Sequence, residues 1–173
     1  MNYFLQGFGV FLGVVAGVIV MHISQWLNER LKEKQKVKNL KFEFMLNIKK
    51  IDSWLEEIGK YRNAVNGDTL QTYFGYFDLS RFVSVTANDM FLSGLLYKYL
   101  EHDDIARLQP IYAEFSLPWE NMLNQQITTF RELAVDYSSW LITKPQVVSH
   151  VNFWEGKLRE HQRTLEEVLK KLE

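Results

Sequence analysis

The first 28 residues of this chain carry no charged side chain, and the stretch from Phe4 to Val20 is apolar apart from Gln6 and its glycines. As a helix rising ~1.5 Å per residue, Tyr3 to Trp26 would be about 35 Å long, which exceeds the ~30 Å hydrocarbon core of a bilayer. The sequence therefore predicts a single transmembrane helix in residues 1–28. Tyr3 and Trp26 are its expected interfacial aromatic residues.

A secretory signal peptide is the main alternative for such an N-terminus. A signal peptide carries a basic residue before its apolar core and a small-x-small cleavage site after it. This chain has no basic residue before Arg30, and Val20 is followed by Met-His-Ile-Ser-Gln-Trp. We therefore favour an uncleaved anchor.

The charges that flank the apolar segment predict its orientation. Residues 29–50 hold eight basic and three acidic side chains, whereas the N-terminal flank has no basic side chain. The positive-inside rule then places the N-terminus outside and the C-terminal body in the cytosol. The absence of cysteine fits a reducing compartment. We expect a single-pass protein of the bacterial inner (plasma) membrane.

The basic stretch has two interpretations. Its side chains are attracted either to anionic lipid headgroups, at ~1 kcal/mol each, or to RNA. Their position directly after the apolar segment favours membrane lipid as the partner. Residues 51–173 contain 12 basic and 18 acidic side chains, which opposes a general nucleic-acid surface, and no DNA partner is expected. The expected headgroup-binding residues are Arg30, Lys32, Lys34, Lys36 and Lys38.

Helical periodicity dominates the rest of the chain, so the predicted fold class is all-α. In residues 29–66 an apolar residue recurs every three or four positions and proline is absent, which predicts one long helix that continues to a turn at Asn66-Gly67-Asp68. Residues 67–173 are expected to form a cytosolic helical bundle whose last helix begins near Thr143-Lys144-Pro145 and resembles a coiled coil. The two predicted apolar stripes are Leu40, Phe44, Ile48, Ile51, Leu55 and Ile58, and Val151, Trp154, Leu158, His161, Leu165, Val168 and Leu172.

Between these long helices the pattern is weaker. Residues 69–87 are rich in aromatic residues without clean alternation, which we interpret as a short helix followed by a packed loop. Asn88 or Asp89 is expected to cap a helix that extends to Leu100. A further helix is expected to begin at Asp103-Asp104 and to be kinked or divided by its prolines, Pro110 and Pro118.

The four histidines do not form a recognisable metal-ligand spacing, and the sequence has no phosphate-binding glycine loop and no catalytic serine or zinc motif. We therefore expect neither a metal nor a cofactor. The His102-Asp103-Asp104 run is better explained by helix capping than by metal binding. His161 lies on an apolar seam, where a core histidine is a simpler interpretation than a pH switch.

Three glycines at four-residue spacing, Gly9, Gly13 and Gly17, lie on one helical face, and Ser24 falls close to the same stripe. Small residues let helices approach closely, so this face predicts a homo-oligomer. A dimer would simply bury the stripe. In a larger ring, polar residues of this segment would be candidates to line a pore, namely Gln6, His22 and Gln25.

With one N-terminal apolar helix that runs into a compact all-α body, the chain resembles the small membrane accessory proteins of type VI CRISPR systems. The resemblance covers the whole chain at the level of architecture. It implies a degenerate HEPN-like body, assembly into a membrane pore, and a cytosolic RNA-guided effector or its RNA product as a partner.

The nuclease motif of HEPN domains is an arginine followed by histidine after four to six residues. Arg62-Asn63 begins such a pattern, but Gly67 stands where a histidine is needed, and no other arginine has a histidine at that spacing. The resemblance therefore implies an inactive copy, and we predict that the chain is not an enzyme.

Together these observations predict an oligomeric pore-forming or membrane-perturbing effector in antiviral defence. The main alternative is a membrane-tethered adaptor that recruits a cytosolic partner without forming a pore. A membrane-bound enzyme that cleaves RNA is a more distant third.

Overall fold

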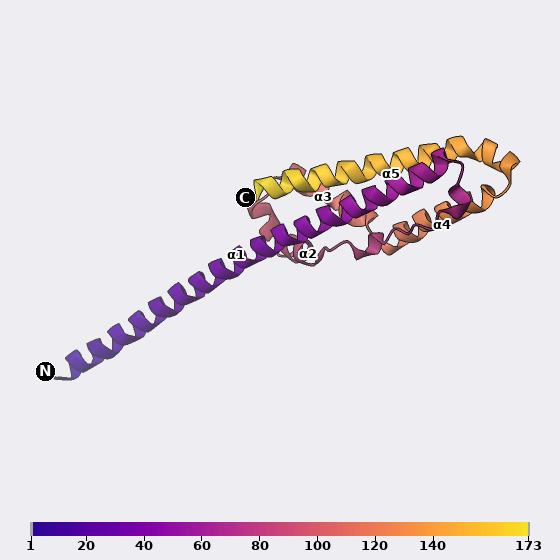
Figure 1. Cartoon of the computed structure of the whole chain (residues 1–173). Helices are drawn as coiled ribbons and strands as arrows, with labels where there is room; N and C mark the ends of the chain where they lie inside the picture. The colour runs from indigo at the N-terminus through magenta and orange to yellow at the C-terminus, as the bar shows by residue number, and fades with distance from the viewer. Residues whose placement is uncertain (1, 173) are drawn as a thin grey trace. The chain divides into compact units, whose positions relative to one another are not determined.

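The computed structural model describes the backbone of residues 2–172 and the side chains of residue 11 and residues 13–172. These residues form five α-helices and three short 3-10 helices and contain no strand, which confirms the all-α prediction. The chain divides into two compact units, residues 1–39 and residues 40–173, called here the N-terminal unit and the helical body. The α-helices, shown in Figure 1, are α1 (Asn2–Asn66), α2 (Val85–Leu92), α3 (His102–Glu114), α4 (Leu117–Leu133) and α5 (Tyr137–Lys171). The 3-10 helices are η1 (Leu70–Thr72), η2 (Leu79–Arg81) and η3 (Leu95–Lys98).

Helix α1 ends at Asn66, where the Asn66-Gly67-Asp68 turn predicted its end, and Asp68 adopts a positive φ of 54°. Its part in the helical body buries one stripe. The predicted Ile48 and Leu55 are only half-buried, because a strict seven-residue repeat carries the buried face through other positions. That face consists of Leu40, Phe44, Asn47, Ile51, Trp54, Ile58, Tyr61 and Val65.

Helix α5 runs alongside the body part of α1 (Figure 1), and the Gln162 side chain donates a hydrogen bond to Asp52 at 2.6 Å. The predicted seam of α5 is buried over its whole length, from Val151 to Leu172. The predicted start was wrong. The helix begins at Tyr137, because the Asp136 side chain accepts a hydrogen bond from the Ser139 N–H at 2.9 Å and caps it, and Pro145 lies inside.

Helix α2 starts earlier than predicted because a distant residue caps it. The buried Glu43 of α1 accepts hydrogen bonds from the backbone N–H groups of Thr86 and Ala87 at 2.7 and 3.1 Å. The helix predicted to reach Leu100 is divided at Gly94, whose φ of 72° suits glycine. Helix η3 follows that turn.

Helix α3 begins as the paired aspartates predicted, with both in its first turn. Asp104 accepts a hydrogen bond from the Glu101 N–H at 3.3 Å and also pairs with Lys171 at 2.7 Å, which joins the start of α3 to the end of α5. Pro110 lies within α3 and does not divide it. The predicted helix is divided at Phe115-Ser116, just before Pro118, which occupies the first turn of α4, where its missing N–H costs least.

Residues 73–84, called here the clamped segment, run irregularly between α1 and α4, apart from the single turn of η2. Two asparagine side chains form hydrogen bonds with backbone groups of this segment. Asn47 donates to the Val83 carbonyl at 2.6 Å and accepts from the Val83 N–H at 2.9 Å. Asn124 makes the same two-way contact with Phe77, at 2.8 and 2.9 Å. Side chains from both flanking helices therefore supply the partners that a neighbouring strand would otherwise supply.

One prediction requires correction. Among the side chains that the structure describes, no helix carries an apolar run long enough to cross a membrane. The predicted single-pass placement in a bacterial inner membrane, with the N-terminus outside and the body in the cytosol, is therefore wrong. The transmembrane part of the predicted fold in residues 1–28 has no support. The side chains of residues 1–10 and 12 lie outside the described ones.

Candidate assembly surface

Most of the described side chains of the N-terminal unit are exposed. From Gly13 to Lys32 every side chain is exposed, and ten large apolar ones among them are accessible by 38% to 65%. A helix that is apolar on most of its circumference normally lies inside a larger assembly or an apolar medium. This part of α1 is therefore the surface of the chain that most requires a partner.

A seven-residue repeat organises this surface. The glycine stripe continues through alternating steps of four and three residues, which keep side chains on one face of a helix that pairs with another. Over the described side chains the stripe contains Gly13, Gly17, Val20, Ser24, Leu27 and Leu31. A shallow groove runs along its C-terminal half, lined by Val20, Ile23, Ser24, Leu27, Asn28 and Leu31.

The glycines of the stripe have no role in the packing of their own chain. A Cβ atom built on Gly13 or Gly17 would meet nothing within 4 Å. Glycine costs about 1 kcal/mol relative to alanine inside a helix, and here no contact within the chain offsets that cost. A closely approaching second backbone would explain both positions.

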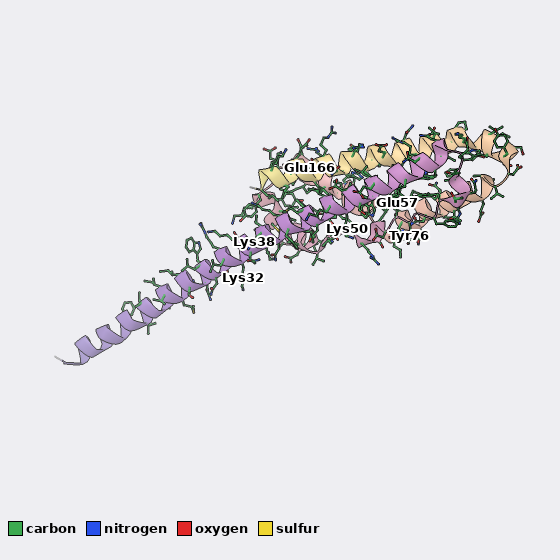
Figure 2. The ribbon with its side chains drawn as sticks, in the orientation of Figure 1. Lys32, Lys38, Lys50, Glu57, Tyr76 and Glu166 are labelled. Atoms are coloured by element: carbon green, nitrogen blue, oxygen red, sulfur yellow. The ribbon has the colours of Figure 1, made fainter. Side chains whose placement is uncertain are left out.

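Basic side chains follow the apolar stretch. Arg30 stacks over the Trp26 ring at 4.4 Å from its centroid, a cation–π contact. Figure 2 shows Lys32 and Lys38 on this part of α1, and both are exposed. Lys34 is also exposed, and Lys36 is half-buried. The predicted headgroup-binding residues are thus placed along one short stretch of helix, and their binding to lipid stays a prediction.

Two of the three predicted pore-lining residues, His22 and Gln25, do not share the stripe. At about 100° per residue, His22 lies roughly 180° from the midline of the stripe and Gln25 roughly 120° from it. Both are exposed. Gln6 and Gly9 have side-chain positions outside the described set. Ser24, by contrast, lies on the stripe as predicted.

The sequence reasoning missed two residues of this surface. Leu27 and Leu31 extend the stripe by one further turn each, and they are exposed by 49% and 63%. The signal that identifies them is the seven-residue spacing itself. The sequence interpretation followed this face only as far as Ser24.

Polar side chains of the helical body form contacts that join one helix to another. His161 is 7% exposed, and its Nε2 lies 2.7 Å from Glu114 of α3, whose other carboxylate oxygen pairs with Lys157. Burial acts to raise the pKa of Glu114, but hydrogen bonds from Lys157 and His161 outweigh it and hold that pKa below its usual value. The ring of His161 also meets Phe115 edge-on. The predicted burial of His161 on the seam of α5 is confirmed.

His150 lies among the rings of Tyr61, Phe130 and Trp154, with centroids 5.3 to 6.3 Å away. Its Nε2 accepts a hydrogen bond from the Trp154 indole N–H at 3.1 Å. Burial lowers the pKa of His150 to about 4, so the imidazole is neutral at physiological pH. A neutral imidazole enclosed by aromatic rings indicates a packing role.

In the part of the chain that the structure describes, no group of three metal-ligating side chains forms. His102 is exposed at the start of α3, while Asp104 beside it is committed to the cap and to Lys171. Capping therefore accounts for Asp104, as predicted.

The chain was compared with protein-family models, curated proteins and solved structures, and it matches none of them. The resemblance to CRISPR accessory proteins accordingly stays a prediction that rests on the layout of the sequence.

Proposed function

We propose that this chain is a self-assembling helical adaptor. The N-terminal parts of α1 from several copies pack together through the seven-residue stripe, and the assembly displays the acidic helical bodies to a partner. The observation that carries the proposal is the exposure of ten large apolar side chains on one helix between Gly13 and Lys32.

The exposed area is too large for an isolated chain. At roughly 100 Å² for each half-exposed side chain, these residues expose on the order of 1,000 Å², against about 300–600 Å² for the largest apolar patch of a typical monomer. Burying half of it on assembly contributes about 12 kcal/mol per chain at ~25 cal/mol per Å². That is comparable with the roughly 4–15 kcal/mol that association costs, so close packing decides whether the oligomer forms.

Glycine at two positions of the stripe favours such close packing between copies. Neighbouring backbones can approach at Gly13 and Gly17, which adds dispersion contacts along the helices. The larger side chains of Val20, Leu27 and Leu31 then fill the seam below the glycines.

Three earlier expectations stay predictions. They are the membrane-perturbing role in antiviral defence, the RNA-guided effector or its RNA product as the partner, and the absence of enzymatic activity. The adaptor requires none of them, because its assembly depends only on the described surface of α1.

The test is the oligomer size of the purified full-length chain, measured by light scattering in one mild detergent throughout. Val20→Asp would place a carboxylate in the seam, and we expect it to weaken association at least tenfold, because the charge must be desolvated. Val18→Asp is the matched control, since two residues correspond to about 200° around the helix. It should leave the oligomer intact.

Glycine packing is tested separately by Gly13→Leu, with Val15→Leu as its control on the opposite face. We expect the first to reduce the oligomer and the second to leave it unchanged. A native oligomer in both Val20→Asp and Gly13→Leu would exclude the seam and move assembly to the helical body.

A further inference from the structure

Helix α1 has an exposed apolar surface where it enters the helical body, on the side opposite its buried stripe. Phe42 lies two residues from both Leu40 and Phe44, which corresponds to about 200° around the helix. Leu40 and Phe44 are fully buried, whereas Phe42 is 60% exposed. Met45 and Leu46 follow one turn later and are exposed by 48% and 36%. Three large apolar side chains therefore lie next to one another on the side of α1 that faces away from the core.

Three lysines border and interrupt this apolar surface. At about 100° per residue, Lys41 lies at one of its edges, Lys50 at the other, and Lys49 between them. Lys49 is exposed, Lys41 and Lys50 are half-buried, and Figure 2 shows Lys50 on α1. None of the three forms an ion pair with a described residue. The surface is called here the basic–apolar face, and it consists of Lys41, Phe42, Met45, Leu46, Lys49 and Lys50.

No acidic side chain of the same stretch offsets these lysines. In residues 34–51 the only acidic residue is Glu43. Its side chain is 3% exposed and accepts hydrogen bonds from the backbone of Thr86 and Ala87, so its carboxylate is turned into the body. Residues 51–173 contain 12 basic and 18 acidic side chains. The basic–apolar face is therefore opposite in charge to the rest of the body.

A bilayer that contains anionic lipids matches this face in both charge and polarity. Its headgroups attract lysine side chains, and the acyl boundary beneath them accepts large apolar ones. Lysine stems can lie along an apolar surface while the ammonium group reaches the headgroups. The opposite side of α1 is buried in the body, so a partner cannot wrap around the helix. A flat surface therefore fits this face better than a groove that encloses a helix.

We propose that the basic–apolar face docks the helical body on the surface of a membrane that contains anionic lipids. The three apolar side chains enter the acyl boundary, and the lysines contact the headgroups. Repulsion between the headgroups and the acidic remainder of the body keeps this side of α1 towards the membrane. The contact requires no helix that crosses the bilayer. It also does not depend on self-assembly, so either proposal can fail without the other.

A fluorescent dye that responds to polarity can test the contact directly, because the chain has no cysteine. Met45→Cys in the full-length chain places the dye on the face. Ile142→Cys is the matched control, since Ile142 is 78% exposed on α5 and lies outside the face. Each labelled chain is added to vesicles of phosphatidylcholine alone or mixed with phosphatidylserine. We expect the emission at Met45 to shift to shorter wavelength only with phosphatidylserine, and the emission at Ile142 to stay unchanged.

The part played by charge is tested by Lys49→Gln in the Met45→Cys chain. The lipid concentration that gives half of the dye signal should rise about fivefold, the usual effect of one basic residue at an anionic surface. Lys144→Gln is the matched control, because it removes the same charge at a lysine that pairs with Asp68 beyond the end of α1. It should leave the half-signal concentration unchanged.

Three results would overturn the proposal. One is an emission at Met45 that does not change with phosphatidylserine, or that changes equally in phosphatidylcholine alone. Another is a shift that appears without vesicles as the protein concentration rises, which would show that a second copy covers the face. The third is a shift with polyglutamate but not with vesicles, which would assign the face to an acidic protein.

Discussion

Removing the Asn47 side chain is the most direct test of how the helical body is held together. Asn47 is fully buried and pairs with both backbone groups of Val83, at 2.6 and 2.9 Å. Asn47→Ala leaves a donor and an acceptor of the clamped segment without partners, at about 1–3 kcal/mol each. Partial access of water and the better helix propensity of alanine offset some of this loss. We expect the free energy of unfolding to fall by about 3 kcal/mol.

The loss can be measured by urea denaturation followed by circular dichroism. With a slope of about 2 kcal/mol per molar urea, the midpoint should decrease by about 1.5 M. Asn63→Ala is the matched control, because Asn63 is exposed on the same helix. It should change stability by less than about 0.5 kcal/mol. A loss below 1 kcal/mol for Asn47→Ala would refute the argument that this side chain supplies the backbone partners of the segment.

Two further predictions concern pH. The pKa of His150 is lowered to about 4 by burial, so stability should be complete above pH 6.5 and should fall as the pH decreases from 6.5 to 4. His150→Gln should remove this dependence, and an NMR titration of the imidazole above pH 6 in the native chain would contradict it. Hydrogen bonds from Ser138 and Ser139 lower the pKa of Asp136 to about 2. The stability that this cap adds to the fold should therefore persist above pH 3.8 and disappear as the pH falls towards 2. In Asp136→Ala the melting temperature should depend less on pH over that range than it does in the native chain.

The long helices could be predicted from the sequence because each buries one face, which gives an apolar residue every three or four positions. In α5 every residue of the predicted seam is buried from Val151 onwards, and Thr164 is buried beside them. In α1 the periodicity gave the correct face only in part, since Asn47 takes a core position that an apolar pattern does not reveal. Its partner is a backbone group 36 residues away.

The middle of the body could not be predicted, because its determinants are distant in sequence. The cap of α2 comes from Glu43, 43 residues before Thr86. Local rules placed the start of that helix at Asn88 or Asp89 instead. The start of α5 was predicted wrongly from a local signal. Pro145 is typical of a helix start, but Asp136 caps the helix nine residues earlier.

The sequence predicted part of the candidate assembly surface. Glycine spacing identified Gly13 and Gly17, whereas their lack of neighbours within the chain could be seen only in the structure.

The pairing of α1 with α5 has a consequence for synthesis on the ribosome. Asp52 meets a residue 110 positions later in the chain, and Arg62 pairs with Glu155. At about 5–20 residues per second, the buried face of α1 is made roughly 5–20 seconds before the helix that covers it. During that interval Leu40, Phe44 and their neighbours are open to aggregation and to chaperones. The nascent chain is therefore at its most vulnerable after α1 has emerged, and completion of α5 ends that exposure.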